Sequence, residues 1–328
     1  MREKVRIHYF IAGVSQSLIG LFSHSLYHSY SIWLFTFSDL KTILIPSTIF
    51  GIANSLAAPS YGLPSLSLPP TLKSKLFYIL LQQTPAVLVW VWINLLPFTI
   101  NNQRDISAIA EDSVNKPWRP LPSKRMTSGQ AKYTMLVFYA AAQTYSLLFS
   151  GGLRQSLGLL VLGTWYNNMG GADSNPLVRN LINALGYLCF ISGALEVALG
   201  GGPLPFYSSQ RLLPWLLVVA GIIISTVHTQ DIYDQEGDAE RGRRTVPLVI
   251  GDRAARWSIA VPMLAWGLFC PIFWNVHVIF ASVSCALAWA VAARTLLFRN
   301  VRSDKRTFII WNLWITTVYV MPLCARVA

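Results

Sequence analysis

The chain has 328 residues, of which 53% are hydrophobic and 12% are charged, and its mean hydropathy is +0.46. Soluble domains carry about 25% charged residues, so this composition excludes an ordinary soluble protein and indicates a helical membrane protein. The net charge of +12 comes from residues in short loops between apolar segments, which favours membrane orientation and an anionic substrate over nucleic-acid binding.

The apolar segments predict an all-α, multi-pass membrane bundle. Residues 7–37 are apolar and aromatic but interrupted by His and Ser, so we expect an amphipathic or interfacial helix within an N-terminal segment, 1–38. A membrane-spanning helix needs about 20 apolar residues. Nine later segments approach that length, which predicts a single transmembrane domain over 39–328. These segments are 40–58, 76–100, 131–150, 153–169, 178–200, 212–230, 255–273, 275–297 and 307–325.

The basic residues predict the orientation of this bundle. If the N-terminus and every even-numbered loop share one side, that side holds 21 lysines and arginines and the opposite side holds 5. The positive-inside rule places the first side in the cytosol. We expect a multi-pass protein of the endoplasmic reticulum, although some of these cations can also serve a substrate.

The first of two acidic windows follows the second predicted span. It is "NNQRDISAIAEDSVNKPWRP", residues 101–120, and it contains Asp105, Glu111 and Asp112. If the helix continues through this window, Asn101, Asp105 and Asp112 fall within about 40° of one another at 100° per residue. The window can then present a stripe of oxygen ligands.

The second acidic window, "HTQDIYDQEGDAERGRR", follows the sixth predicted span and ends at residue 244. On a helix, Asp231, Asp234 and Asp238 fall within about 60° of one another, and Glu236 and Glu240 lie on the opposite face. Both windows are at predicted cytosolic helix ends, so the two stripes can face each other.

Carboxylate and amide oxygens suit Mg²⁺, which binds through one or two carboxylates and bridges to substrate phosphates. Basic residues follow each stripe: Lys116 and Arg119 after the first, and Arg241, Arg243 and Arg244 after the second. Carboxylates that can bind a metal ion, next to Lys and Arg side chains that can bind phosphate, favour a diphosphate site. The alternative is a pair of solvated loops in which Arg and Asp pair locally.

The two windows resemble those of the UbiA superfamily of intramembrane prenyltransferases. The family's first signature is roughly NDxxDxxxD, and its second leads into a Gly-Arg-Arg-Thr-like segment, here "DIYDQEGDAERGRRTVPLVIG". The resemblance implies nine transmembrane helices around a central apolar cavity, with both motifs holding Mg²⁺ and a polyprenyl diphosphate at its cytosolic mouth. The implied metal ligands are Asn101, Asp105, Asp112, Asp231, Asp234 and Asp238.

The first motif departs from the family pattern. Asn102 replaces the usual Asp, Ile109 occupies the third acidic position, and Glu111 and Asp112 come two and three residues late. Helical phase favours Asp112 as the carboxylate that completes the site. The form "EDSVNKPWRPLPS" resembles a fungal branch of the superfamily that includes membrane-bound sesquiterpene cyclases.

The resemblance implies ionisation of a polyprenyl diphosphate, with farnesyl diphosphate the expected substrate. Mg²⁺, Lys116, Arg119 and Arg244 would stabilise the leaving diphosphate. A cyclase then closes the allylic cation on its own double bond, whereas a prenyltransferase passes it to an aromatic or polyketide acceptor. We favour the cyclase because of the branch resemblance. A further polar group around the loop between the fourth and fifth spans can line the same mouth, although helix capping and loop solvation explain it almost as well. Its members are Asn167, Asn168, Asp173, Arg179 and Asn183.

Other candidate residues carry weaker signals. A cyclase cavity needs aromatic walls, and the candidates in predicted spans are Trp90, Trp92, Tyr139, Trp165, Tyr166 and Tyr187, although lipid packing explains each of them as well. Glu196 lies within a predicted span, where a carboxylate is costly and suggests function. The five histidines and four cysteines show no ligand spacing or paired spacing. A transporter is less favoured because few other polar residues lie deep in the spans, and the sequence leaves the oligomeric state open.

Overall fold

The computed structural model describes residues 22–64, 69, 71–206 and 209–326. Within these residues every regular element is a helix, which confirms the predicted all-α class. The longer helices are α2 (Ile45–Leu56), α4 (Thr84–Gln103), α6 (Ser128–Tyr145), α7 (Leu153–Asn168), α8 (Pro176–Ala198), α9 (Leu212–Thr226), α12 (Asp252–Trp274), α13 (Val278–Leu297) and α14 (Val301–Val320). The shorter helices are α3 (Leu72–Tyr78), α5 (Ile106–Asn115), α10 (Gln235–Glu240) and α11 (Val246–Ile250).

Each of the predicted membrane segments overlaps one of these longer helices. In the described part of the chain, 6 helices are long and apolar enough to cross a membrane. They are Leu72–Gln103, Pro176–Ala198, Leu212–Gln230, Asp252–Trp274, Val278–Leu297 and Val301–Cys324. The chain is therefore an integral membrane protein, and the count of nine spans stays a prediction.

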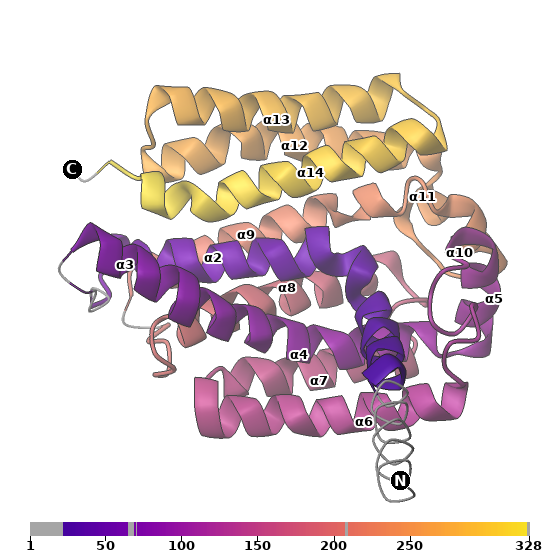
Figure 1. Cartoon of the computed structure of the whole chain (residues 1–328). Helices are drawn as coiled ribbons and strands as arrows, with labels where there is room; N and C mark the ends of the chain where they lie inside the picture. Colours follow the sequence, from indigo (N-terminus) through magenta and orange to yellow (C-terminus); the bar gives the residue numbers. More distant parts are fainter. Residues whose placement is uncertain (1–21, 65–68, 70, 207–208, 327–328) are drawn as a thin grey trace, which may run out of the picture.

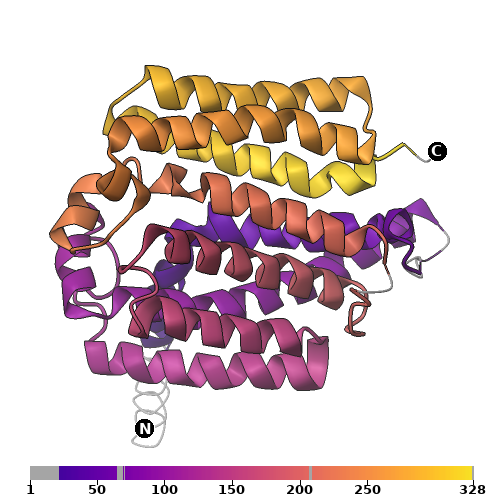
Figure 2. The same ribbon diagram turned by 180° about the vertical axis from the view of Figure 1, so that it is seen from behind.

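The long helices run roughly along one direction, so their ends collect at two ends of the bundle (Figure 1). Helices α12, α13 and α14 form one side, α6 and α7 form the other, and α2, α8 and α9 lie between them (Figures 1 and 2). The short helices α5 and α10 lie at the same end, and α3 lies at the opposite end (Figure 1). The two acidic windows, far apart in the sequence, therefore meet at one end of the molecule.

Helices α4 and α8 pack closely against each other. Trp90 of α4 is fully buried, and its indole Nε1 donates to Ser146 Oγ at 2.9 Å. A Cβ added at Gly193 of α8 would lie 2.0 Å from the Trp90 ring. Only glycine therefore allows α8 to approach this tryptophan so closely.

A helix at residues 22–36 crosses the bundle direction at the end that carries the acidic windows (Figure 1). Its Phe35 is fully buried, and the Phe35 carbonyl accepts a hydrogen bond from Gln103 Nε2 at 2.8 Å. Arg125 Nε donates to Ser31 Oγ at 3.0 Å. Part of the predicted interfacial helix, residues 7–21, lies outside the described residues, and the boundary at residues 38 and 39 stays a prediction.

The assumption that the helix continues through the first acidic window is wrong. Helix α4 ends at Gln103, and α5 begins at Ile106 after Asp105 adopts an extended backbone with φ −71° and ψ 150°. The second window is not one continuous helix either, because a 3-10 turn (Val227–Gln230) and a loop separate α9 from α10. Helical phase therefore does not decide which carboxylates share a surface.

Candidate active site

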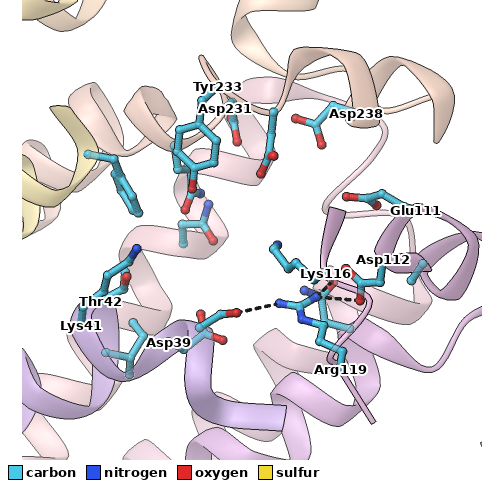
Figure 3. Close-up of a pocket in the computed structure, with 18 of the residues that line it drawn as sticks. Asp39, Lys41, Thr42, Glu111, Asp112, Lys116, Arg119, Asp231, Tyr233 and Asp238 are labelled. Atoms are coloured by element: carbon cyan, nitrogen blue, oxygen red, sulfur yellow. Dashed lines mark hydrogen bonds and ion pairs between the residues drawn. The ribbon is translucent and has the colours of Figure 1, made fainter. Parts of the chain in front are cut away.

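A cavity of about 720 Å³ opens at the end of the bundle where the two acidic windows meet. Seven cationic and six acidic side chains line it, so the charges nearly balance. Figure 3 shows Asp231 and Asp238 on one side of the cavity, and Lys116, Arg119 and Asp39 on the facing side. The charged lining residues are Asp39, Lys41, Glu111, Asp112, Lys116, Arg119, Arg179, Asp231, Asp234, Asp238, Arg241, Arg243 and Lys305.

The second window places all three of its predicted aspartates in this cavity. Asp231 Oδ1 accepts from Arg179 Nη2 at 3.0 Å, and Asp238 Oδ1 accepts from Arg243 Nη1 at 3.0 Å. The Oδ2 atoms of Asp231 and Asp238 are buried and accept no hydrogen bond from any described residue. Each of these two carboxylates therefore keeps one oxygen without a hydrogen-bond partner.

Burial raises the pKa of Asp234 and the pKa of Asp238 above the ordinary aspartate value. Lys116 opposes this rise at Asp234 and Arg179 opposes it at Asp238, whereas neighbouring carboxylates add to it. Crowded, partly desolvated carboxylates of this kind gain stability in their charged form when a cation binds between them.

The first window contributes Glu111 and Asp112 to the cavity. Asp112 is 2% exposed, and its Oδ1 and Oδ2 accept from Arg119 Nη1 at 2.9 and 2.7 Å. Glu111 Oε2 lies 3.6 Å from Arg241 Nη1. Asp112 therefore orients the guanidinium of Arg119, and the ion pair is buried on both sides.

The structure does not bring Asn101 and Asp105 into this cavity. They line a separate hollow of about 220 Å³, which adjoins the cavity at Arg241 because that side chain lines both. Asn101 is held by Asn168, whose Oδ1 accepts from Asn101 Nδ2 at 2.8 Å. Asp105 is exposed, and a hydrogen bond from Ser107 Oγ, at 2.7 Å, lowers its pKa.

Arg244 is also outside the cavity, where we expected it to bind the diphosphate. Its side chain is exposed, and its backbone N–H donates to the Asp173 carbonyl at 2.8 Å. Arg241 and Arg243, its neighbours in the same basic run, line the cavity instead. Of the other cations predicted at the site, Lys116, Arg119 and Arg179 all line it.

An apolar pocket of about 70 Å³ adjoins the charged cavity. Six residues line both spaces: Asp39, Ile43, Phe98, Tyr166, Asn183 and Tyr187. The rest of the pocket is almost entirely aliphatic or aromatic, with Leu95, Leu159, Leu162, Ile182 and Phe190 among its walls. The charged cavity therefore opens into an apolar pocket.

Comparison with known proteins decides the family. The profile of the UbiA prenyltransferase family matches residues 84–314, about 70% of the chain. The chain belongs to the UbiA prenyltransferase family. It is 30% identical over 299 residues to fumagillin beta-trans-bergamotene synthase af520 of Aspergillus fumigatus, covering 90% of this chain and 92% of that protein. It is also 30% identical over 302 residues to somaliensene A/B synthase of Streptomyces somaliensis, covering 89% of this chain and 91% of that protein.

Solved structures show the same fold. A UbiA homologue from Archaeoglobus fulgidus bound to GPP and Mg²⁺ superposes with a TM-score of 0.55 at 14% identity, covering 86% of this chain and 98% of that chain. A UbiA homologue from Aeropyrum pernix K1 gives 0.59 at 16% identity, covering 83% and 94%. This UbiA chain is thus a membrane-bound enzyme, a terpene cyclase or a prenyltransferase.

The predicted aromatic residues of this UbiA enzyme divide into two groups. Tyr166 and Tyr187 line both the cavity and the apolar pocket. The other four, Trp90, Trp92, Tyr139 and Trp165, line neither space. The indole of Trp92 donates to Thr36 Oγ1 at 3.2 Å, a structural contact with the N-terminal helix. Sequence alone does not distinguish the two groups, because both lie in apolar helices.

Glu196 lies at the far end of α8, away from the cavity. Its carboxylate accepts from Gly152 N at 2.9 Å, Arg154 Nη2 at 2.8 Å and Leu204 N at 3.2 Å. These bonds join the loop after α6 to the loop after α8. The cost of this buried carboxylate is offset by hydrogen bonds, which gives Glu196 a structural role.

Several cavity residues were not singled out from the sequence. Asp39 and Lys41 lie just before α2 in "FSDLKT", and Lys305 lies in the first turn of α14. Tyr233 lies between two of the predicted aspartates, and Asn102 occupies the position where the family usually has Asp. A signal existed for the three charged residues, since each stands at the predicted cytosolic end of a predicted span.

The cavity residues fit a magnesium ion. Among the described residues, no group of three or more His, Cys, Asp or Glu side chains is placed to hold a metal by itself. Mg²⁺ seldom uses such a cage, because it takes one or two carboxylates together with waters and phosphate oxygens. The unpaired Oδ2 atoms of Asp231 and Asp238 supply hard oxygen donors of this kind.

Proposed function

We propose that this enzyme releases diphosphate from farnesyl diphosphate in a Mg²⁺-dependent step and closes the resulting allylic cation to a sesquiterpene. The observation that carries the proposal is the direct junction between a charged cavity and an apolar pocket, which six residues share. A prenyl diphosphate likewise joins a charged diphosphate group to an apolar chain. The resemblance to a bergamotene synthase over 90% of the chain supports cyclisation.

In this proposal Asp231, Asp234 and Asp238 hold the metal, which supplies positive charge to the leaving diphosphate. Lys116 and Arg119 reach the cavity from the opposite side and donate hydrogen bonds to the diphosphate oxygens (Figure 3). Arg179 also lines the cavity and already orients Asp231. These cations stabilise the charge that develops as the carbon–oxygen bond breaks.

The apolar pocket serves the second part of the reaction. Three aromatic rings lie where the two spaces meet, those of Phe98, Tyr166 and Tyr187. The ring centroids of Phe98 and Tyr166 are 5.6 Å apart. Ring faces stabilise cations, and aliphatic walls exclude the water that would otherwise capture the carbocation as an alcohol. Cyclisation is therefore favoured over simple hydrolysis.

The alternative is a prenyltransferase that passes the allylic cation to an aromatic or polyketide acceptor. Its support is the likeness to the polyprenyl transferase eriF of Hericium erinaceus, 25% identical over 69% of this chain. Both alternatives share the ionisation step and the same charged cavity, so they differ only in what captures the cation.

One assay separates these alternatives. Membranes containing the enzyme are incubated with Mg²⁺ and farnesyl diphosphate, and the headspace and the released diphosphate are measured. We expect a volatile cyclic hydrocarbon, which EDTA abolishes and excess Mg²⁺ restores. Release that begins only when a phenolic acceptor is added would establish the transferase instead. Release that is unaffected by EDTA would contradict the metal site.

We also propose that the mouth of the cavity faces the cytosol from the endoplasmic reticulum membrane. The excess of basic residues on that side supports this orientation. The N-terminal segment 1–38 would then lie at the cytosolic interface, with residues 39–328 as the transmembrane domain. Protease protection of a tag at either terminus in sealed microsomes tests the orientation.

A further inference from the structure

We propose that Asp39 accepts the proton whose loss ends the cyclisation. This inference rests on the proposed function, and it adds a residue that the two acidic windows do not contain. Asp39 lies at the end of a short 3-10 turn (Phe37–Asp39), between the helix at residues 22–36 and α2.

Asp39 lies where the charged cavity and the apolar pocket meet. It lines both the charged cavity and the apolar pocket, so it stands where the prenyl chain would pass from one to the other. Among the described residues that line the apolar pocket, Asp39 is the one carboxylate. The aspartates of the second window line the charged cavity alone. A carbocation in the pocket therefore lies nearer to Asp39 than to any of them.

The Asp39 carboxylate is also available to accept a proton. Its side chain makes no hydrogen bond or ion pair within 4.0 Å to any described residue, whereas Asp112 and Asp231 are both paired to arginines. Lys41, Lys116 and Arg119 lie close enough to act on it electrostatically, as do the hydroxyls of Tyr187 and Tyr233. These cations favour the carboxylate form without occupying its oxygens.

Burial makes this carboxylate a stronger base than an exposed one. It raises the pKa of Asp39 above the ordinary value, although Arg119, Lys116 and Lys41 oppose the rise. The other polar groups that line both the cavity and the apolar pocket are the amide of Asn183 and the hydroxyls of Tyr166 and Tyr187. Neutral amides and phenols are much weaker proton acceptors than a carboxylate.

The step balances without another reactant. A C–H bond next to the cationic carbon breaks, its electron pair becomes the carbon–carbon double bond of the product, and the proton moves to a carboxylate oxygen of Asp39. The neutral carboxyl group then returns the proton to water through the charged cavity. No oxidant or reductant is needed.

The test compares Asp39→Asn with the unchanged enzyme in membranes supplied with Mg²⁺ and farnesyl diphosphate. An amide of the same shape cannot accept the proton, and positioned bases contribute about 100-fold or more to such transfers. We expect diphosphate release within about threefold of the unchanged enzyme, while the share of the normal cyclic hydrocarbon falls at least about tenfold. Alcohols or isomeric hydrocarbons take its place. Asp39→Glu, which keeps a carboxylate, should restore most of the cyclic product.

Two results would overturn the inference. One is an Asp39→Asn product mixture identical to that of the unchanged enzyme. The other is a loss of diphosphate release as large as that of Asp234→Ala, which would place Asp39 in the ionisation step. If Asp39→Asn does not accumulate in membranes, Asp39→Ala replaces it as the variant without a carboxylate, with the same expected loss of the normal cyclic hydrocarbon and the same contradicting results. Absence of any cyclic product from the unchanged enzyme would instead refute the proposed function.

Discussion

The two acidic windows reach the same end of the bundle but use it differently. The second window, residues 228–244, places Asp231, Asp234 and Asp238 in one cavity. The first window, residues 101–120, divides its carboxylates, because Asp105 faces a separate hollow while Asp112 faces the cavity. In the proposed site, the second window therefore supplies the oxygens for a cation, and the first supplies mainly an oriented arginine and a lysine.

A difference in local structure explains this division. Between Gln103 and Ile106 the backbone leaves the helix, so residues before and after the break point in unrelated directions. In the second window, Asp238 N donates to the Asp234 carbonyl at 2.9 Å, and Asp234 N donates to the Asp231 carbonyl at 3.3 Å. This compact turn keeps three carboxylates on one wall. Sequence spacing is informative in the second window because the backbone between the aspartates stays in a compact turn, whereas it fails in the first window because the backbone is extended at Asp105.

Removing a carboxylate from the second window should have the largest effect. We expect Asp234→Ala to lower diphosphate release by about 1000-fold, because metal charge stabilisation contributes several kcal/mol. Glu240→Ala is the matched control, since Glu240 is exposed in the same window, and it should stay within about twofold. Release is measured with farnesyl diphosphate and Mg²⁺ in membranes. Equal losses in the two variants would show that the window acts through folding.

In the first window, the buried ion pair should matter for stability. Asp112→Ala leaves the Arg119 guanidinium buried without a carboxylate, which costs about 3 kcal/mol in the free energy of unfolding. Thermal unfolding in detergent measures this loss. The double variant Asp112→Ala/Arg119→Met should recover much of the stability while remaining poor in diphosphate release. An unchanged unfolding midpoint in the single variant would contradict the structural role of the pair.

A smaller effect is expected at Asp105. Because this carboxylate is exposed and lies outside the cavity, Asp105→Ala should reduce diphosphate release by about tenfold at most. A parallel assay of Asp105→Ala and Asp234→Ala checks the difference. Equal losses would show that residues 104–112 rearrange on substrate binding and bring Asp105 to the metal.

The smallest effect should come from Arg244. Its side chain is exposed, so Arg244→Gln should change release by about twofold or less. Arg243→Gln is the informative partner, because it leaves the buried Asp238 without its 3.0 Å ion pair. If Arg244→Gln proves the more damaging of the two, the assignment of cations to the cavity is wrong.

Much of the fold was predictable because a membrane demands apolar side chains along whole helices. Each predicted segment overlaps a long helix, and alternation of the helices places both windows at one end. The family was predictable from the second window, where "DIYDQEGDAERGRRT" is nearly complete. The break at residues 104 and 105 was not predictable, since no Pro or Gly interrupts the stretch from Asn101 to Asp112.

The cavity itself depends on contacts between distant residues. Asp39 and Lys305 join it only because the N-terminal turn and α14 pack at the same end of the bundle. Glu196 shows the opposite case, a buried charge that the sequence marks as functional and that the structure uses to hold two loops together. The sequence marks Glu196 as unusual, and only the fold identifies its partners.

In the proposed site, both windows hold one diphosphate together. The most direct test is the Mg²⁺-dependent Kd of a non-ionising analogue, farnesyl thiolodiphosphate, for the detergent-solubilised enzyme. We predict that Arg119→Gln in the first window and Asp238→Asn in the second each weaken binding by about tenfold or more, since each removes a charged contact. Unchanged affinity in either variant would contradict a shared site.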